Sequence, residues 1–145
     1  MPAPYAAFPP KKTMSEIPFK PTGYSTVSVY LVADGAQRVI DFLQAVLDVE
    51  PLRRDDRPDG LVEHAEVRLG DSVVMLTDSA EGFPAFPVWL HVYVPDVDET
   101  YRRALDAGGQ SVQEPRQKGD ADRRSGVMDP CGNTWWFATQ VGEAE

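Results

Sequence analysis

The sequence predicts an α+β fold of two βαβββ modules with pseudo-two-fold symmetry, whose strands form a curved mixed sheet around a cleft. Three observations lead to this prediction. One order of strand-like and helix-like segments occurs twice, each time over about 55 residues. The length of 145 residues suits one domain. Each helix-like segment has a single apolar stripe, so the two modules should share one core.

Five segments divide the chain. Residues 1–22 are predicted to be an extended tail, because six of the 13 prolines lie there, and residues 23–79 form the first module. A linker at 80–86 leads to the second module at 87–141, and residues 142–145 are an acidic tail. Lys11 and Lys12 follow an apolar stretch instead of preceding it, which is not the pattern of a secretory signal. Met14 is an alternative first residue of the protein, with residues 1–13 then an upstream extension.

The first module opens with a β-rich run at residues 24–33. Asp34 lies three residues before Gln37, a capping-box pattern that predicts a helix start, and apolar residues then recur at helical spacing up to Leu47. We predict a charged loop at 53–59. Two strands follow, at 61–69 and 72–77, joined by a hairpin turn at Gly70-Asp71.

The second module repeats this order. A strand at 88–94 precedes a helix that begins after Asp96, which has Glu99 three residues on, and ends at Gly108. A strand at 110–114 and a charged loop at 116–124 come next. The last strands, at 124–129 and 133–140, flank a turn at 129–133. Residues 70–77 align with residues 132–139 at identical spacing.

Alternation along the strands gives each sheet two different faces. In the strand at 88–94, aliphatic residues alternate with Trp89, His91 and Tyr93. Tyr30 lies on the polar face of the first strand, and His64 and Glu66 share one face of the strand at 61–69. The aliphatic faces are expected to cover the helices, and the polar-aromatic faces to line a ligand cleft.

Composition excludes several classes of protein. The formal net charge of −9 disfavours binding to nucleic acids and anionic membranes, and no apolar run is long enough to span a bilayer. A single cysteine, Cys131, excludes a disulfide framework and a multi-cysteine zinc site, and favours a cytoplasmic protein. We predict that Cys131 is inert, because no base or helix N-terminus is implied beside it.

Several motifs occur in a characteristic order: residues 23–31, 40–42, 64–66, 70–78, 90–98, 107–109 and 129–135. In this order they resemble the vicinal oxygen chelate superfamily, which includes glyoxalase I, bleomycin-resistance proteins and extradiol dioxygenases, and within it the PhnB-like branch. The resemblance spans about residues 22–141. It implies the two-module fold around a cleft, usually in a homodimer.

The resemblance also locates a possible metal site. Metal-dependent members carry one ligand on the first strand and one on the last strand of each module. Those positions fall on Ser28 and Met75 (or Val74) in the first module, and on Trp89 (or His91) and Trp136 in the second. Serine, methionine and tryptophan are poor ligands for a divalent cation. The resemblance therefore favours the metal-free members that sequester ligands, with no cofactor.

An alternative uses His64, Glu66 and His91. Two histidines and one carboxylate are the ligands of a facial triad that holds one divalent metal ion. The same residues are candidates for acid–base catalysis without a metal, as in a lyase, isomerase or dioxygenase-like enzyme. The structural interpretation is that His64 and Glu66 bond to each other at the cleft wall, while His91 lies between Trp89 and Tyr93.

We therefore predict a non-enzymatic protein that binds a small, flat organic molecule in an aromatic-lined cleft. An acidic protein also attracts cationic ligands. Arg124 lies where PhnB-like proteins carry a Gly-Asp-Arg motif, here stretched to residues 119–124, and pairs either with an anionic ligand or with the nearby aspartates. The predicted ligand-binding residues are Ser28, Tyr30, Met75, Trp89, His91, Tyr93, Arg124 and Trp136.

Overall fold

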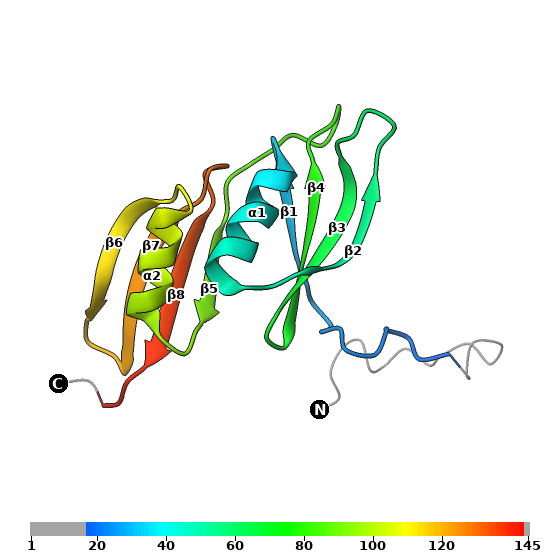
Figure 1. Ribbon diagram of the computed structural model, residues 1–145. Helices are drawn as coiled ribbons and strands as arrows, with labels where there is room; N and C mark the ends of the chain where they lie inside the picture. The colour runs from blue at the N-terminus through cyan, green and yellow to red at the C-terminus, as the bar shows by residue number, and fades with distance from the viewer. Residues whose placement is uncertain (1–16, 144–145) are drawn as a thin grey trace.

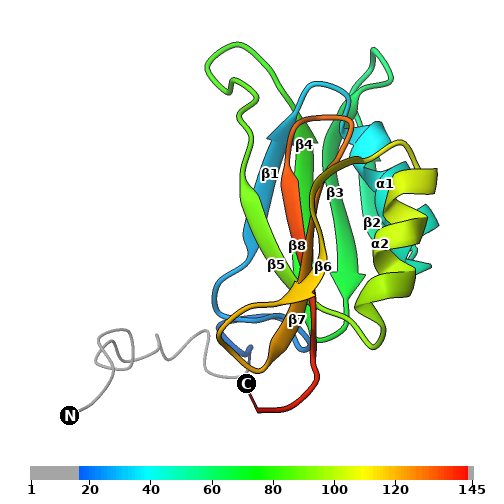
Figure 2. The ribbon, with the colours of Figure 1, turned by 90° about the vertical axis from the view of Figure 1, so that its left-hand side faces the viewer.

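Two four-stranded mixed sheets stand side by side in the computed structural model, which describes residues 17–143, and both helices lie on the same side of the sheets (Figures 1 and 2). The first module comprises β1 (Val29–Ala33), α1 (Ala36–Leu47), β2 (Pro51–Asp56), β3 (Val62–Leu69) and β4 (Ser72–Asp78). The second comprises β5 (Trp89–Tyr93), α2 (Val97–Asp106), β6 (Gln110–Gln117), β7 (Asp122–Met128) and β8 (Thr134–Gln140).

The strand orders are β1-β4-β3-β2 and β5-β8-β7-β6, so both sheets have the same topology. The first strand of each module pairs in parallel with the last, and the other pairs are antiparallel. The predicted α+β fold of two βαβββ modules is confirmed. The strands form two sheets instead of one, because β1 and β5 end their sheets and pair with no strand of the other module within the described residues.

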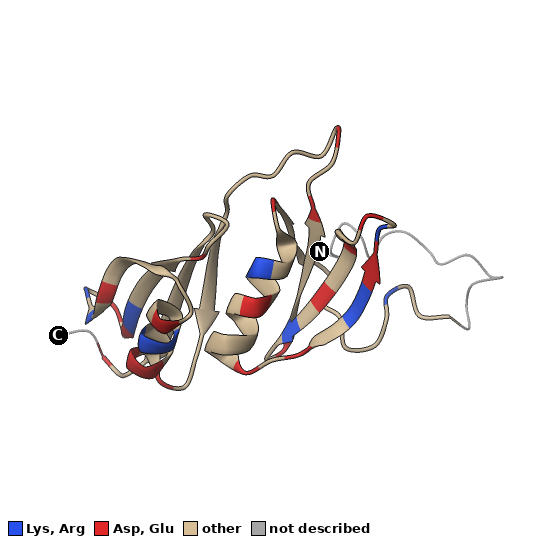
Figure 3. Ribbon diagram, turned by 45° about the horizontal axis from the view of Figure 1, so that its top comes forward, with Lys and Arg blue, Asp and Glu red and all other residues tan. Residues whose placement is uncertain are grey.

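Three predicted boundaries were wrong. Strand β1 begins at Val29 and not at residue 24, because its partner β4 begins at Ser72, beside the hairpin turn, and leaves little backbone for earlier residues to pair with. Residues 51–56 form edge strand β2, although they were assigned mostly to a charged loop. Figure 3 shows charged residues along β2, and these residues are exposed, as is usual for an edge strand. The second charged loop is also shorter, since β6 reaches Gln117 and β7 begins at Asp122.

The two helices start differently. Asp96 caps α2 as predicted, with its carboxylate accepting the backbone N–H of Glu99 at 3.1 Å. Asp34 does not cap α1, because Gly35 is the N-cap residue and has no side chain. The carboxylate of Asp78, at the end of β4, accepts the backbone N–H groups of Gly35 and Ala36 instead, both at 2.8 Å. A residue distant in sequence therefore replaces the local cap.

The helices bind the modules into one core, as predicted. Both helices contribute buried side chains to a single cluster that includes residues from both sheets. Phe42 of α1 meets Trp135 of β8, with ring centroids 6.4 Å apart. Full burial of side chains of this size contributes about 1.5–3 kcal/mol each. The packing of α1 against α2 therefore ties the modules together on the helical side.

Part of the N-terminal tail, residues 17–22, contains no helix or strand, and residues 1–16 lie outside the described part of the chain, as do the last two residues of the acidic tail. Within residues 17–143, no helix has the length and apolar character needed to cross a membrane.

Candidate functional site

The sheet faces opposite the helices carry the polar and aromatic side chains that alternation predicted. In Figure 2 both helices lie on one side and leave the other side of the sheets open. The open faces differ between the modules. Aromatic rings dominate on β5 and β8, which contain no Asp, Glu, Lys or Arg, whereas β3 of the first module carries Glu66 and His64 beside Tyr30 of β1.

Trp136 is the centre of the aromatic face. Its ring lies against Gly126 of β7, where a Cβ atom would come within 2.6 Å of the ring. Trp89 of β5 meets it edge-on, with ring centroids 5.2 Å apart, and is 76% exposed. The indole N–H of Trp136 is buried without a hydrogen-bond partner in the described part of the chain. The glycine thus lets a large flat ring lie on the sheet, and Trp89 extends that surface into solvent.

A polar cluster borders this aromatic face. The Nε2 atom of His91 accepts a hydrogen bond from Nε of Arg124 at 3.0 Å. Arg124 also pairs with Asp122 at 2.9 Å and Asp120 at 3.3 Å, so it contacts the nearby aspartates, one of the two predicted alternatives. The Tyr93 hydroxyl donates to Asp122 at 2.7 Å, and this bond raises the pKa of Tyr93. Sequence reasoning missed Asp122, whose contacts arise only when β5 and β7 flank β8.

A groove of about 560 Å³ runs along the free edge of β5. Trp89, His91 and Tyr93 line one wall, and Val29 and the β3–β4 hairpin lie across from them. The groove therefore separates the two modules beside the aromatic face.

The first module carries a chain of four hydrogen-bonded side chains. The Tyr30 hydroxyl lies 3.1 Å from Nδ1 of His64, and Nε2 of His64 lies 2.7 Å from Oε2 of Glu66. The Tyr24 hydroxyl donates to the other oxygen of Glu66. Glu66 is only 4% exposed. The predicted contact between His64 and Glu66 is thus present, and Tyr24 was not foreseen.

Electrostatics keep Glu66 ionised. Burial alone would raise the pKa of its carboxyl group, but the hydrogen bonds from Tyr24 and His64 outweigh burial and lower it. The same bond to the carboxylate raises the pKa of Tyr24. A buried carboxylate with two donors orients the imidazole of His64.

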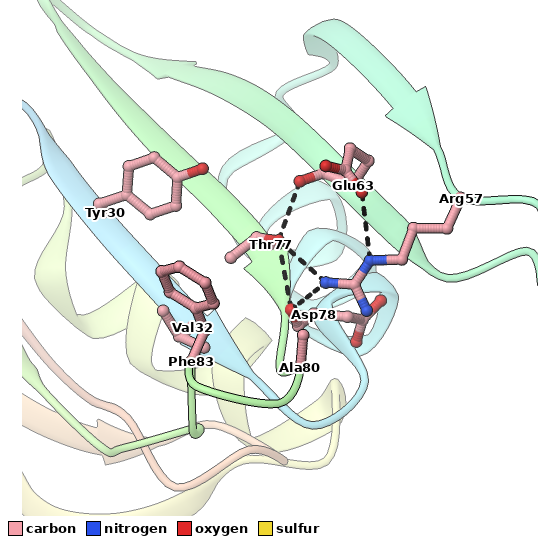
Figure 4. A pocket seen from close by; sticks show the side chains of 8 residues that line it. All are labelled: Tyr30, Val32, Arg57, Glu63, Thr77, Asp78, Ala80 and Phe83. Carbon is pink, nitrogen blue, oxygen red and sulfur yellow. Dashed lines mark hydrogen bonds and ion pairs between the residues drawn. The ribbon is translucent and has the colours of Figure 1, made fainter.

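A second cavity, of about 580 Å³, opens beside Tyr30 (Figure 4). The Tyr30 and Phe83 rings lie on one side of it, with Arg57 and Glu63 on the other and Thr77 between them. Sequence reasoning missed these residues except Tyr30, because Arg57 and Phe83 lie in segments that were assigned to loops.

The positions that correspond to the family's metal ligands do not fit a divalent cation. On the open face Tyr30 pairs in register with Met75, and His91 with Trp136. Neither methionine nor tryptophan is a ligand of the hard type, and the Nε2 atom of His91 already accepts an arginine N–H. Val74 is excluded as a ligand, because it faces the helix and belongs to the core.

The alternative triad is not assembled. His64 contacts Glu66 in the first sheet, while His91 contacts Arg124 in the second. Among residues 17–143, no group of three or more His, Cys, Asp or Glu side chains is arranged to hold a metal ion. The alternative metal site would require His91 of β5 to meet His64 and Glu66 of β3, and these strands belong to different sheets.

Four of the predicted ligand-binding residues line neither cavity: Ser28, Met75, Arg124 and Trp136. Ser28 precedes β1. Cys131 lies in the β7–β8 turn, where burial raises the pKa of its thiol. Its Sγ atom lies 3.5 Å from the carbonyl oxygen of Gly35 in the first module. Cys131 thus packs between the modules, in agreement with an inert role.

Comparisons with known proteins agree with this architecture. The profile of the Glyoxalase/Bleomycin resistance protein/Dioxygenase superfamily matches residues 25–137. An uncharacterized protein of Mycobacterium tuberculosis is 34% identical over 128 residues, which cover 81% of this chain and 75% of that protein.

Solved structures show the same fold. TioX from Micromonospora sp. ML1 is 28% identical, with a TM-score of 0.69 over 80% of this chain and 98% of its own. TnmS3, an antibiotic binding protein from Streptomyces sp. CB03234, is 17% identical, with a TM-score of 0.61 over 80% of this chain and 97% of its own. At that identity the second likeness concerns the fold alone. The chain belongs to the glyoxalase/bleomycin resistance protein/dioxygenase superfamily.

Proposed function

We propose that the protein is a metal-free, non-enzymatic binding protein that holds a small, flat organic molecule against Trp89 and Trp136. The observation that carries this proposal is the exposed, uncharged aromatic face of β5 and β8, where two indole rings meet beside a groove. Flat rings gain affinity there from apolar burial and from offset or edge-to-face contacts, which are worth about 0.5–1.5 kcal/mol per pair beyond the buried area. Gly126 has no side chain and therefore leaves room for the Trp136 ring on the sheet.

The net charge of the protein indicates which ligand charge it should prefer. A net charge of −9 attracts cations over several ångströms, and β5 and β8 add no charge of their own. We therefore infer that planar aromatic cations bind better than anions of the same size. TnmS3 shows that this fold accommodates an antibiotic in another protein, which supports antibiotic-like molecules as the first compounds to test.

The experiment is a screen of planar aromatic antibiotics and dyes by thermal shift, followed by tryptophan fluorescence titration. Trp135 is buried in the core and serves as an internal reference. Trp136→Ala should weaken binding by about 1–3 kcal/mol, roughly 5- to 150-fold. A ligand that binds Trp136→Ala as tightly as the wild-type protein would remove Trp136 from the site.

The metal-free character has a separate test. Elemental analysis of untagged protein purified without chelators should find no stoichiometric zinc, nickel, iron or manganese, and none of these ions should raise the melting temperature. Near-stoichiometric metal that is lost on His64→Ala would contradict the proposal and favour the metalloenzyme alternative.

The homodimer, the cytoplasmic location and membership of the PhnB-like branch remain proposals. The exposed Val27, Phe86 and Val112 side chains, which lie outside both cavities, support assembly with a second copy, because exposed apolar surface is often covered by a partner. Light scattering at micromolar concentration should give twice the monomer mass.

A further inference from the structure

The Tyr30 hydroxyl is controlled by the two residues behind it. The ionised carboxylate of Glu66 can only accept hydrogen bonds, so the Nε2 atom of His64, 2.7 Å away, carries a proton. Neutral His64 then has a lone pair on Nδ1, which accepts the O–H of Tyr30 at 3.1 Å. The Tyr30 oxygen is left with acceptor capacity only. Neutral His64 thus makes Tyr30 an acceptor for a ligand.

Protonation of His64 reverses this polarity. The Nδ1 atom then donates to the Tyr30 oxygen, which frees the Tyr30 O–H to donate elsewhere. The hydroxyl lies at the wall of the 580 Å³ cavity, where Phe83 adds a second ring. The state of His64 therefore decides which hydrogen-bonding groups the cavity accepts.

The opposite wall also favours a cationic donor. Glu63 lines the cavity and its side chain is 64% exposed. Arg57 is held to the wall, since its guanidinium donates to Glu63 and to the carbonyl oxygen of Ser79, at 3.3 and 3.0 Å, and is only 18% exposed. Two aromatic rings and an exposed carboxylate are the usual surroundings of an organic cation.

We propose that this cavity is a second ligand site, for a planar aromatic cation that donates N–H groups, such as an amidinium or guanidinium. The ligand's ring packs against Phe83 and Tyr30, and an N–H group donates to the Tyr30 oxygen. His64 and Glu66 are positioning residues that keep this oxygen an acceptor. The site is separate from the aromatic face around Trp136, and it binds its ligand whether or not that face binds one.

The charged and titratable groups that face His64 are few. Glu66 lies beside it on β3, Tyr30 on β1, and Asp55 opposite it in register on β2. Asp55 is itself paired with Arg53 at 2.9 Å, and Tyr24 bonds to Glu66. The hydrogen-bonding polarity of Tyr30 should therefore follow the protonation state of His64.

The test uses benzamidine, benzamide and benzoate, which have the same ring size and keep their charges between pH 5.5 and 8. Binding to the full chain is followed by amide NMR shifts. At pH 8, benzamidine should bind best of the three and shift residues of β1 and β3. Tyr30→Phe should weaken it about three- to tenfold, the usual effect of one hydrogen bond. Tyr101→Phe is the matched control, because the Tyr101 hydroxyl bonds to Ser111 away from both cavities, and it should leave the benzamidine shifts on β1 and β3 unchanged.

Protonation of His64 on acidification should weaken benzamidine and strengthen benzoate in the wild-type protein. His64→Gln should remove this pH dependence. The proposal is overturned if benzamidine does not bind, or if Tyr30→Phe binds it as tightly as the wild type does. It is also overturned if benzoate binds more tightly than benzamidine at pH 8. In Trp136→Ala the benzamidine shifts on β1 and β3 should remain while any shifts on β5 and β8 are lost, which separates this result from the test of the aromatic face.

Discussion

The two modules share one backbone topology but carry different side chains at equivalent places on their open faces. Glu66 and Gly126 occupy equivalent places on β3 and β7, because each lies in register with the open-face residue of the last strand, Met75 and Trp136 respectively. In the first module a buried carboxylate stands beside a slender thioether. In the second, a glycine stands beside an indole.

This exchange shows how one fold makes two kinds of site. Glu66 gathers Tyr24 and His64 into a polar chain, whereas the missing side chain at Gly126 lets Trp136 lie flat. The neighbour on the third strand of each sheet thus decides whether the last strand contributes to a polar or an aromatic surface. The differences lie on the open faces, while the helical faces share one core.

The largest change in stability is expected at the helix caps, which differ between the two modules. Asp78 and Thr139 are equivalent, since Asp78 accepts the N–H of Ala36 at 2.8 Å and Thr139 that of Val97 at 3.0 Å, each the first residue of its helix. Asp78 also accepts the N–H groups of Gly35 and Val62. Asp78→Ala should therefore cost about 2–4 kcal/mol, and Thr139→Ala about 1 kcal/mol.

Urea unfolding measures both changes at constant slope. Asp78→Asn is the intermediate case, because the amide oxygen still accepts but carries no charge. Equal losses for the alanine variants would mean that the two caps do the same work, contrary to their hydrogen-bond counts.

The second test fills the space at Gly126. Gly126→Ala places a methyl group 2.6 Å from the Trp136 ring and should cost about 1–3 kcal/mol as the ring tilts away. It should also weaken any ligand of the aromatic face. In a Trp136→Leu background the same substitution should cost much less, since leucine leaves room. Additive losses in the double variant would show that the two positions do not interact.

The third test uses acid. In the folded protein the pKa values of Asp78 and Glu66 lie below their ordinary values. Burial alone would raise both pKa values. Hydrogen bonds from backbone N–H groups to Asp78, and from Tyr24 and His64 to Glu66, outweigh burial and lower them. Both groups therefore stabilise the fold above the unfolded pKa of about 4, and this contribution is lost as pH falls through the folded value. Between pH 5 and 3, Glu66→Gln should lose about 1 kcal/mol less than the wild type. An unchanged slope would remove Glu66 from the set of stabilising carboxylates.

The smallest effect is expected at Arg124. Its pairs with Asp120 and Asp122 lie at the surface, where such pairs are worth about 0–1 kcal/mol. Arg124→Gln should thus leave the melting temperature within about 2–3 °C of the wild type. A larger loss would indicate that this cluster is a structural element of the second module, like Glu66 in the first.

Local patterns predicted much of this fold. Asp96 and Glu99 are neighbours in sequence, so the cap of α2 was predictable, and the i, i+2 spacing of His64 and Glu66 placed them together. The sequence pattern at Asp34 predicted a cap for α1 equally well. In the structure, however, Asp78 of β4 accepts the N–H of Ala36 at the start of that helix. The sequence did not predict the strand register, which places Met75 opposite Tyr30 and Trp136 opposite His91. Register and long-range contacts carry no local signal.

The most direct test of the central claim is an amide NMR titration with one planar aromatic cation that passes the thermal-shift screen. Backbone shifts should include β5 and β8 around Trp89 and Trp136, and these shifts should vanish in Trp136→Ala while the spectrum of the core remains intact. Shifts confined to the first module, or shifts on β5 and β8 that are retained in Trp136→Ala, would contradict a binding site on the aromatic face.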